Sequence, residues 1–213
     1  MIGSLHSLLE WTEDTAAEEI AAADALVCRA PPLPAPGTCI VLVPADESEA
    51  TLRAAVRLKP FALALMGCRS GADVQRLDVL LSVAEAIEGV APGTTRILAW
   101  TDGILPAPFD DAGFDGKSAR LSGLVWDWRA LARLLGASRC RNDDGAWTHA
   151  FASARTATLM SAKVAGVPVY EVAEGGSDFA ADCRRARADG FDGRVAVAAG
   201  QLAIINQAFA SPP

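Results

Sequence analysis

The chain has 213 residues, 51% of them hydrophobic, and a formal net charge of −7. This length and composition favour one domain with a full hydrophobic core and exclude a disordered or fibrous chain. The acidic balance argues against a nucleic acid or an anionic membrane surface as a partner. No apolar run approaches the roughly 18 residues of a membrane span, and the first residues lack the basic start of a signal peptide. We therefore expect a cytoplasmic protein.

The cysteines support the same compartment. They are odd in number, widely spaced and without a CxxC pair: Cys28, Cys39, Cys68, Cys140 and Cys183. This pattern is typical of reduced, buried thiols and not of a disulfide framework or a zinc site.

Apolar runs of strand length alternate with amphipathic segments in the first third of the chain. Strands are expected at residues 5–9, 25–28, 38–43 and 61–66. One helix is expected to begin at a cap on Thr12 or Asp14 and to end at Ala22, and another to span residues 47–58. The four prolines of residues 29–37 (RAPPLPAPG) exclude a regular helix there.

The longest regular segment covers residues 69–103. Apolar side chains recur at helical spacing at Val74, Leu77, Leu80, Leu81, Ala84 and Ile87. The other face carries Asp73, Gln75, Arg76, Asp78 and Glu85, which predicts an amphipathic helix. Gly89 and the pair Pro92 and Gly93 end this helix, and the apolar run at residues 96–100 follows as a buried strand. A helix followed by a buried strand is the unit of a parallel α/β sheet.

The same alternation continues to the C-terminus. Strands are expected at residues 121–126, 167–170 and 194–198, and helices at 128–135, 146–165, 177–189 and 201–209. Asp182 and the arginines of residues 184–187 are expected on the solvent face of their helix. Residues 104–116, rich in Pro, Gly and Asp, are expected to form a loop.

Eight strands, most of them followed by a helix, predict a compact (β/α)8 TIM barrel that uses residues 1–213 as a single domain. The Pro-rich and Asp-rich segments are where helices two and five would be shortened. No GxGxxG motif follows the first strand, which argues against an open dinucleotide-binding sheet.

Four stretches, in matching order and spacing, resemble the citrate lyase beta-subunit-like proteins of the HpcH/HpaI aldolase family. They are residues 23–28 (ADALVC), 70–103, 154–172 and 190–209 (GFDGRVAVAAGQLAIINQAF). The resemblance implies a barrel that assembles into trimers or larger homo-oligomers. It also implies an enzyme that uses Mg²⁺ to form or cleave a carbon–carbon bond in a CoA thioester or a 2-oxo acid.

The positions that carry chemistry in that family hold other residue types here. By the resemblance, Trp100 stands in place of the first metal ligand, a glutamate, and Ala130 in place of the second, an aspartate. Residues 41–43 (VLV) replace the Arg-Val-Asn that engages the substrate, and Ala198 replaces a histidine. Tryptophan and alanine offer no oxygen to Mg²⁺, so nothing would polarise a 2-oxo acid. We therefore expect the carbon–carbon bond chemistry of the family to be lost. No catalytic residue is assigned, and no cofactor is expected.

Two nearby acids leave an alternative open. Asp102 lies two positions after Trp100, and Asp127 lies three positions before Ala130. Both follow expected strands, at the end of the barrel where active sites are built. A shifted Mg²⁺ site on these two carboxylates would support a diverged carbon–carbon lyase. The other interpretation is that both are loop-opening or helix-capping aspartates.

Large side chains replace the family's polar motifs at the strand ends: Arg29, Arg69, Trp100, Trp126 and Trp128. Arginines and indoles together would hold a small carboxylate or a planar anion, and by the resemblance an acyl-CoA. Alternatively, the tryptophans plug the mouth of the barrel and the arginines lie in solvent. Three hypotheses follow: a non-catalytic binding, assembly or regulatory relative; a diverged lyase; or a structural partner of an active paralogue.

Overall fold

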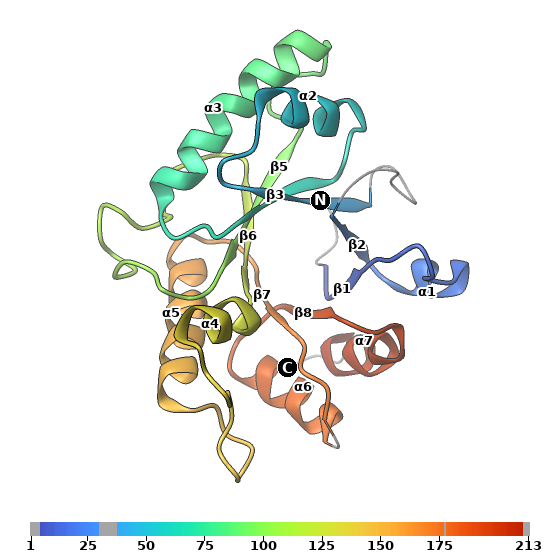
Figure 1. Ribbon diagram of the computed structural model, residues 1–213, viewed down its shortest axis with the longest axis vertical. Helices are drawn as coiled ribbons and strands as arrows, with labels where there is room; N and C mark the ends of the chain where they lie inside the picture. Colours follow the sequence, from blue (N-terminus) through green and yellow to red (C-terminus); the bar gives the residue numbers. More distant parts are fainter. Residues whose placement is uncertain (1–4, 30–37, 177, 211–213) are drawn as a thin grey trace.

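The computed structural model describes residues 5–29, 38–176 and 178–210. Eight parallel strands close into a barrel in the order β1 to β8, with β8 paired back to β1 (Figure 1). The strands are β1 Ser7–Glu10, β2 Ala25–Cys28, β3 Cys39–Pro44, β4 Ala62–Met66, β5 Arg96–Thr101, β6 Leu121–Trp126, β7 Val169–Val172 and β8 Gly193–Ala196. The predicted (β/α)8 barrel is confirmed.

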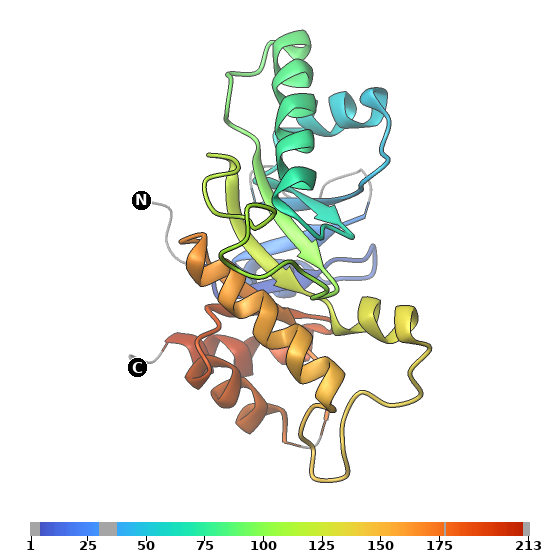
Figure 2. The same ribbon diagram turned by 90° about the vertical axis from the view of Figure 1, so that its left-hand side faces the viewer.

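Seven α-helices in the described part of the chain surround the strands (Figures 1 and 2). They are α1 Ala17–Ala22, α2 Glu49–Arg57, α3 Gly71–Glu88, α4 Trp128–Leu135, α5 His149–Val164, α6 Phe179–Ala188 and α7 Leu202–Ala210, the last preceded by a 3-10 turn at Ala199–Gln201. The shortened helix expected after the fifth strand is absent, because residues 102–120, all of them described, contain no helix. Residues 30–37, where the helix after the second strand was expected to be shortened, lie outside the described residues. None of the described helices has the length and apolar character needed to cross a membrane.

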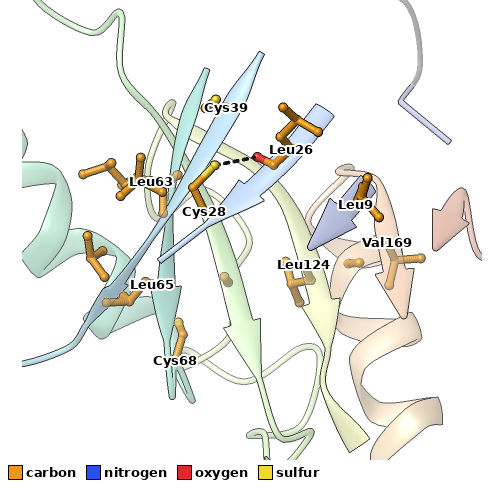
Figure 3. Packing of buried hydrophobic residues seen from close by; sticks show 14 of the residues in the cluster. Leu9, Leu26, Cys28, Cys39, Leu63, Leu65, Cys68, Leu124 and Val169 are labelled. Atoms are coloured by element: carbon orange, nitrogen blue, oxygen red, sulfur yellow. Dashed lines mark hydrogen bonds between the residues drawn. The ribbon is translucent and has the colours of Figure 1, made fainter. Parts of the chain in front are cut away.

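Strand side chains alternate between two separate cores. The fully buried residues of the barrel interior all come from strands: Leu8, Ala25, Val27, Ile40, Leu42, Ala62, Ala64, Leu98, Trp100, Val125, Tyr170, Val172 and Val195. The outer core packs the strands against the helices, and Figure 3 shows part of it, including Leu26, Leu63 and Leu124. None of the five cysteines, all of which lie in the described ranges, forms a disulfide, and four of them are buried. A filled lumen leaves the ends of the barrel as the place for a site.

Helix α3 begins at Ser70, whose hydroxyl accepts from the backbone N–H of Asp73, and ends at Gly89 with a left-handed φ of 65°. Two side-chain placements predicted for this helix were wrong. Glu85, expected in solvent, is fully buried because Arg120 donates to both of its carboxylate oxygens at 2.9 and 2.8 Å. Ile87, expected in the core, is 50% exposed because it lies on a different face of the helix from the buried positions, which include Val74, Leu77 and Leu81.

The predicted placement of Asp182 on α6 was also wrong, since this residue was expected to face solvent. Its carboxylate faces the barrel wall, where Arg194 of β8 donates to it at 2.8 Å. Arg194 is fully buried and lies 3.0 Å from Glu171 of β7 as well. A buried guanidinium requires such partners because it loses its hydration. Asp182 therefore belongs to the layer between the barrel and α6.

The short first helix also begins later than predicted. Its N-cap position is Ala16, beyond both Thr12 and Asp14. Glu19 supplies the cap instead, because its carboxylate accepts from the backbone N–H of Ala16 at 2.9 Å. The helix is held at its start by an acidic side chain in its first turn, as the helix dipole favours.

Candidate functional site

The carboxyl ends of the strands form one mouth of the barrel, and Trp100 of β5 lies at its floor. Trp100 belongs to the interior core, with only 3% of its surface exposed. Its strand neighbour in register is Met66 of β4, and both Met66 and Trp128 pack against the same core. The indole therefore occupies lumen space at the end where barrel proteins build their sites.

Asp127 anchors the mouth because it joins the end of β6 to the start of α4. Its Oδ1 accepts from the backbone N–H of Arg129 at 3.0 Å, which makes it the N-cap of α4. Its Oδ2 accepts from the indole N–H of Trp100 at 3.0 Å. Burial disfavours the charged carboxylate, but hydrogen bonds from Arg129 and Trp100 and the charge of Arg129 outweigh this and lower the pKa of Asp127. The capping interpretation of Asp127 is confirmed.

The side chain of Arg129 then bridges the rim of the mouth. It donates to both oxygens of Asp127, from Nε at 2.9 Å and from Nη2 at 3.1 Å. It also donates to both oxygens of Glu10, the last residue of β1, at 3.0 and 2.6 Å. Because β7 and β8 lie between β6 and β1 in the barrel, this contact skips two strands. We call the set Trp100, Asp127, Arg129 and Glu10 the mouth bridge.

Asp102, the other candidate metal ligand, lies directly after β5 and is also bound by an arginine. Arg69 donates to its Oδ2 from Nη2 at 2.6 Å and from Nε at 3.2 Å. Its Oδ1 accepts from the backbone N–H of Ile104 at 3.0 Å, which closes the turn after the strand. Asp102 is thus the first residue of the loop after β5, in agreement with the interpretation of it as a loop-opening aspartate.

The remaining candidates do not share one environment. Trp126 is fully buried in a separate cluster with Leu131 and Phe151, outside the lumen, so it is not available to a ligand in the mouth. Trp128 is partly buried, and its indole N–H is buried without a hydrogen-bond partner in the described part of the chain. Arg29 is exposed at the end of β2. The structure brings Arg69, Trp100 and Trp128 to the mouth and places Trp126 behind it.

The acidic side chains of the mouth do not fit a magnesium ion as they are arranged. Mg²⁺ requires several oxygen ligands in near-octahedral geometry, yet Asp102 and Asp127 each spend their oxygens on an arginine and on backbone N–H groups. A guanidinium this close repels a dication. Within the described ranges, no group of three or more His, Cys, Asp or Glu side chains is placed to hold a metal.

Two residues of the mouth bridge, Glu10 and Arg129, were not among the sequence candidates. Glu10 is the charged residue at the last position of the first strand, SLLE, and Arg129 follows Asp127 by two residues. A charge at the end of a buried strand is the signal that was available. Their contact joins residues 119 positions apart, so no local pattern pairs them.

The fold and the mouth define a (β/α)8-barrel protein with an arginine-rich rim. No protein-family model and no curated protein matches the sequence. Solved structures share the fold over the whole chain. The CitE protein of Mycobacterium tuberculosis in complex with magnesium and acetate is 20% identical, with a TM-score of 0.72 over 100% of this chain and 93% of that chain.

Two further structures agree. The citrate lyase beta subunit of M. tuberculosis complexed with oxaloacetate and magnesium is 18% identical over 99% of each chain, with a TM-score of 0.72. RipC of Yersinia pestis is 17% identical over 98% of this chain and 96% of that chain, with a TM-score of 0.66. At these identities the likeness establishes the fold alone. The chain has the barrel fold of the citrate lyase beta subunits, which confirms the predicted resemblance at that level.

Proposed function

We propose that this barrel is a non-catalytic binding or assembly relative of the citrate lyase beta subunits, whose mouth takes a small carboxylate without a metal. The observation that carries the proposal is the pairing of both rim acids with arginines, Asp102 with Arg69 and Asp127 with Arg129. Carboxylates neutralised in this way leave no oxygen-rich site for Mg²⁺, while tryptophan occupies the position of a metal ligand in the resemblance.

Without a metal ion, carbon–carbon bond cleavage is lost, but the groups that can bind a carboxylate remain. Cleavage of a carbon–carbon bond beside a carbonyl needs an electrophile that stabilises the enolate, and no group of that kind is assigned here. Binding a carboxylate needs only cationic and N–H donors. Arg29 is exposed at the rim, and the indole N–H of Trp128 has no partner in the described chain. The CitE and citrate lyase beta subunit structures named above hold acetate and oxaloacetate, each together with magnesium, and these are ligands of this class.

The alternative function is a diverged Mg²⁺-dependent lyase acting on a CoA thioester or a 2-oxo acid through Asp102 and Asp127. It is favoured by one observation: the two acids follow β5 and β6, which are neighbouring strands of the barrel. For this function both Arg69 and Arg129 would have to release their carboxylates when the ion binds.

We further propose that the chain assembles with copies of itself in the cytoplasm. The support is the outward face of α3, where Val79, Val83 and Ile87 are 65%, 45% and 50% exposed. These positions recur every four residues and so lie on one stripe of the helix. The four acids of α3 are turned to internal partners: Asp73 to Ser70 at the N-cap, Asp78 and Glu85 to Arg120, and Glu88 to arginines of α2. Arg76 is also exposed on this side of the helix, but from Val79 to Ile87 the exposed stripe is apolar, which is typical of a contact surface.

The binding proposal is tested by titrating pyruvate, acetoacetate and oxaloacetate into the protein, with and without Mg²⁺, and following both partners by NMR. We expect saturable shifts of ligand or protein signals that do not depend on Mg²⁺, and no cleavage of any of the three compounds beyond that in a protein-free sample, with or without acetyl-CoA. Magnesium-dependent turnover above the protein-free rate would overturn the proposal in favour of the lyase. The absence of any shift would overturn the binding function itself.

A further inference from the structure

Of the cations at the mouth, Arg129 makes the most hydrogen bonds. Its contact with Glu10 has the geometry by which an arginine binds a carboxylate ligand. Nη1 and Nη2 donate in parallel to the two oxygens of one carboxylate, at 3.0 and 2.6 Å. This two-bond geometry is the one that guanidinium groups use to recognise free carboxylates. Glu10 therefore fills a carboxylate-binding position with a side chain of the protein itself.

The two acids on Arg129 differ in how firmly they are fixed. Asp127 caps α4, accepts from Trp100 and is buried, so its carboxylate cannot leave without breaking these bonds. The side chain of Glu10 is 23% exposed, and the hydrogen bonds assigned to its carboxylate come from Arg129 alone within the described chain. Rotation of the Glu10 side chain into water would free two N–H groups of Arg129 and leave the cap of α4 intact.

The surroundings of this position suit a small organic acid. Trp100 and Trp128 both pack against the interior core, and Trp100 and Arg129 both donate to the carboxylate of Asp127. Trp128 directly precedes Arg129 in the first turn of α4, and its buried indole N–H has no acceptor among the described residues. A buried donor without an acceptor costs free energy, and an oxygen of a bound ligand would remove that cost.

From this geometry we infer that Arg129 is the carboxylate anchor of the mouth and that Glu10 is an internal competitor, which a small carboxylate ligand displaces. The ligand class rests on the proposed function, whereas the anchor and the competitor rest on the contacts of Arg129. Because a tethered carboxylate competes at high effective concentration, the wild-type protein binds such ligands weakly.

The experiment is a calorimetric titration of acetate and benzoate into the wild type, Glu10→Gln and Arg129→Lys. Acetamide and benzamide serve as uncharged controls of the same shape. Glu13→Gln and Arg133→Lys are the matched controls, because both residues are exposed on neighbouring turns of the chain. Unfolding curves of all variants establish that each one is folded at the temperature of the titration.

We expect Glu10→Gln to bind both acids at least tenfold more tightly than the wild type, and Arg129→Lys to lose the binding. The amides should not bind, and the two control variants should behave as the wild type does. Equal affinity of the acids for the wild type, Glu10→Gln and Arg129→Lys would overturn this inference. A residue other than Arg129 would then bind the carboxylate at the mouth. Failure of every variant to bind either acid would overturn both the inference and the proposed binding function.

Discussion

Trp100 and Trp128 lie at the same mouth but differ in the state of one N–H group. The indole of Trp100 donates to Asp127, whereas the buried indole N–H of Trp128 has no partner in the described chain. Replacement by phenylalanine removes the N–H and part of the ring in both cases. We expect Trp100→Phe to cost at least about 1 kcal/mol more free energy of unfolding than Trp128→Phe, because it also leaves a buried acceptor without its donor. Urea denaturation of the two variants measures the difference, and equal costs would contradict the assigned contacts.

Asp127 is the residue on which the mouth depends most, since it caps α4 and binds both Trp100 and Arg129. Loss of a helix cap costs about 1 kcal/mol, and the unpaired buried donors add a similar amount. Asp127→Ala is therefore expected to destabilise the protein by about 2 kcal/mol, a fall in Tm of about 4–8 °C for a chain of this size. The exposed residue Asp143 offers the matched control, and Asp143→Ala should change Tm by little. A normal Tm for Asp127→Ala would show that the mouth bridge is not structural.

Contacts between residues close in the sequence could be predicted from it, whereas contacts between distant residues could not. That Asp127 caps a helix follows from an acid placed between a buried strand and an amphipathic segment. That Arg129 reaches Glu10 does not follow, because the contact depends on how β1 and β6 are placed around the closed barrel. Trp126 was grouped with the mouth because it ends a strand, yet the alternation of side chains along β6 turns it outward.

Among the elements, α3 shows how a buried ion pair shapes a helix. Arg120, in the turn before β6, binds Glu85 through both nitrogens of its fork and Asp78 at 2.6 Å. Burial alone would raise the pKa of Glu85, but hydrogen bonds from Arg120 and from the backbone N–H groups of Thr95 and Gly93 lower it to about 2. The charged form of Glu85 thus holds the β5–β6 connection to the helix.

This pKa sets the direction of an acid effect on stability. An unfolded glutamate has a pKa of about 4.3, so the stabilisation is complete above that pH and is lost as the pH falls towards 2. We expect Glu85→Gln to cost about 3–5 kcal/mol at pH 7, since it leaves the buried guanidinium of Arg120 with only Asp78 as an acidic partner. The gap between the variant and the wild type should narrow between pH 4 and pH 2. Denaturant titrations at several pH values measure it, with the exposed Glu18→Gln as control. A gap independent of pH would contradict the ion pair.

Element boundaries were predicted best where composition changes abruptly. Strands β2 and β6 and helix α4 match their predicted residues, since each apolar or amphipathic run is bounded by charged or loop-forming residues. The start of β7 was predicted two residues early, because Val167 precedes a proline and the strand ladder begins only at Val169. The count of strands, and with it the barrel, followed from the repeated alternation and not from any single motif.

For the whole molecule, the apolar stripe of α3 predicts self-association. Val83→Asp places a charge in the middle of that stripe, and a buried unpaired carboxylate is costly at an interface. We expect the variant to sediment as a smaller species than the wild type in analytical ultracentrifugation. Val197→Asp changes an exposed valine beyond β8 and should leave the sedimentation unchanged. Identical sedimentation of the wild type and Val83→Asp would exclude this face as the contact.

We propose that this chain keeps the barrel fold of the citrate lyase beta subunits and has lost their metal chemistry. The most direct test is calorimetric titration of Mg²⁺ and Mn²⁺ into the wild type and into the double variant Asp102→Ala, Asp127→Ala, with and without oxaloacetate. We expect no saturable metal binding in either protein, because Arg69 and Arg129 occupy the two carboxylates. Saturable binding to the wild type that disappears in the double variant would contradict it and would establish the shifted metal site.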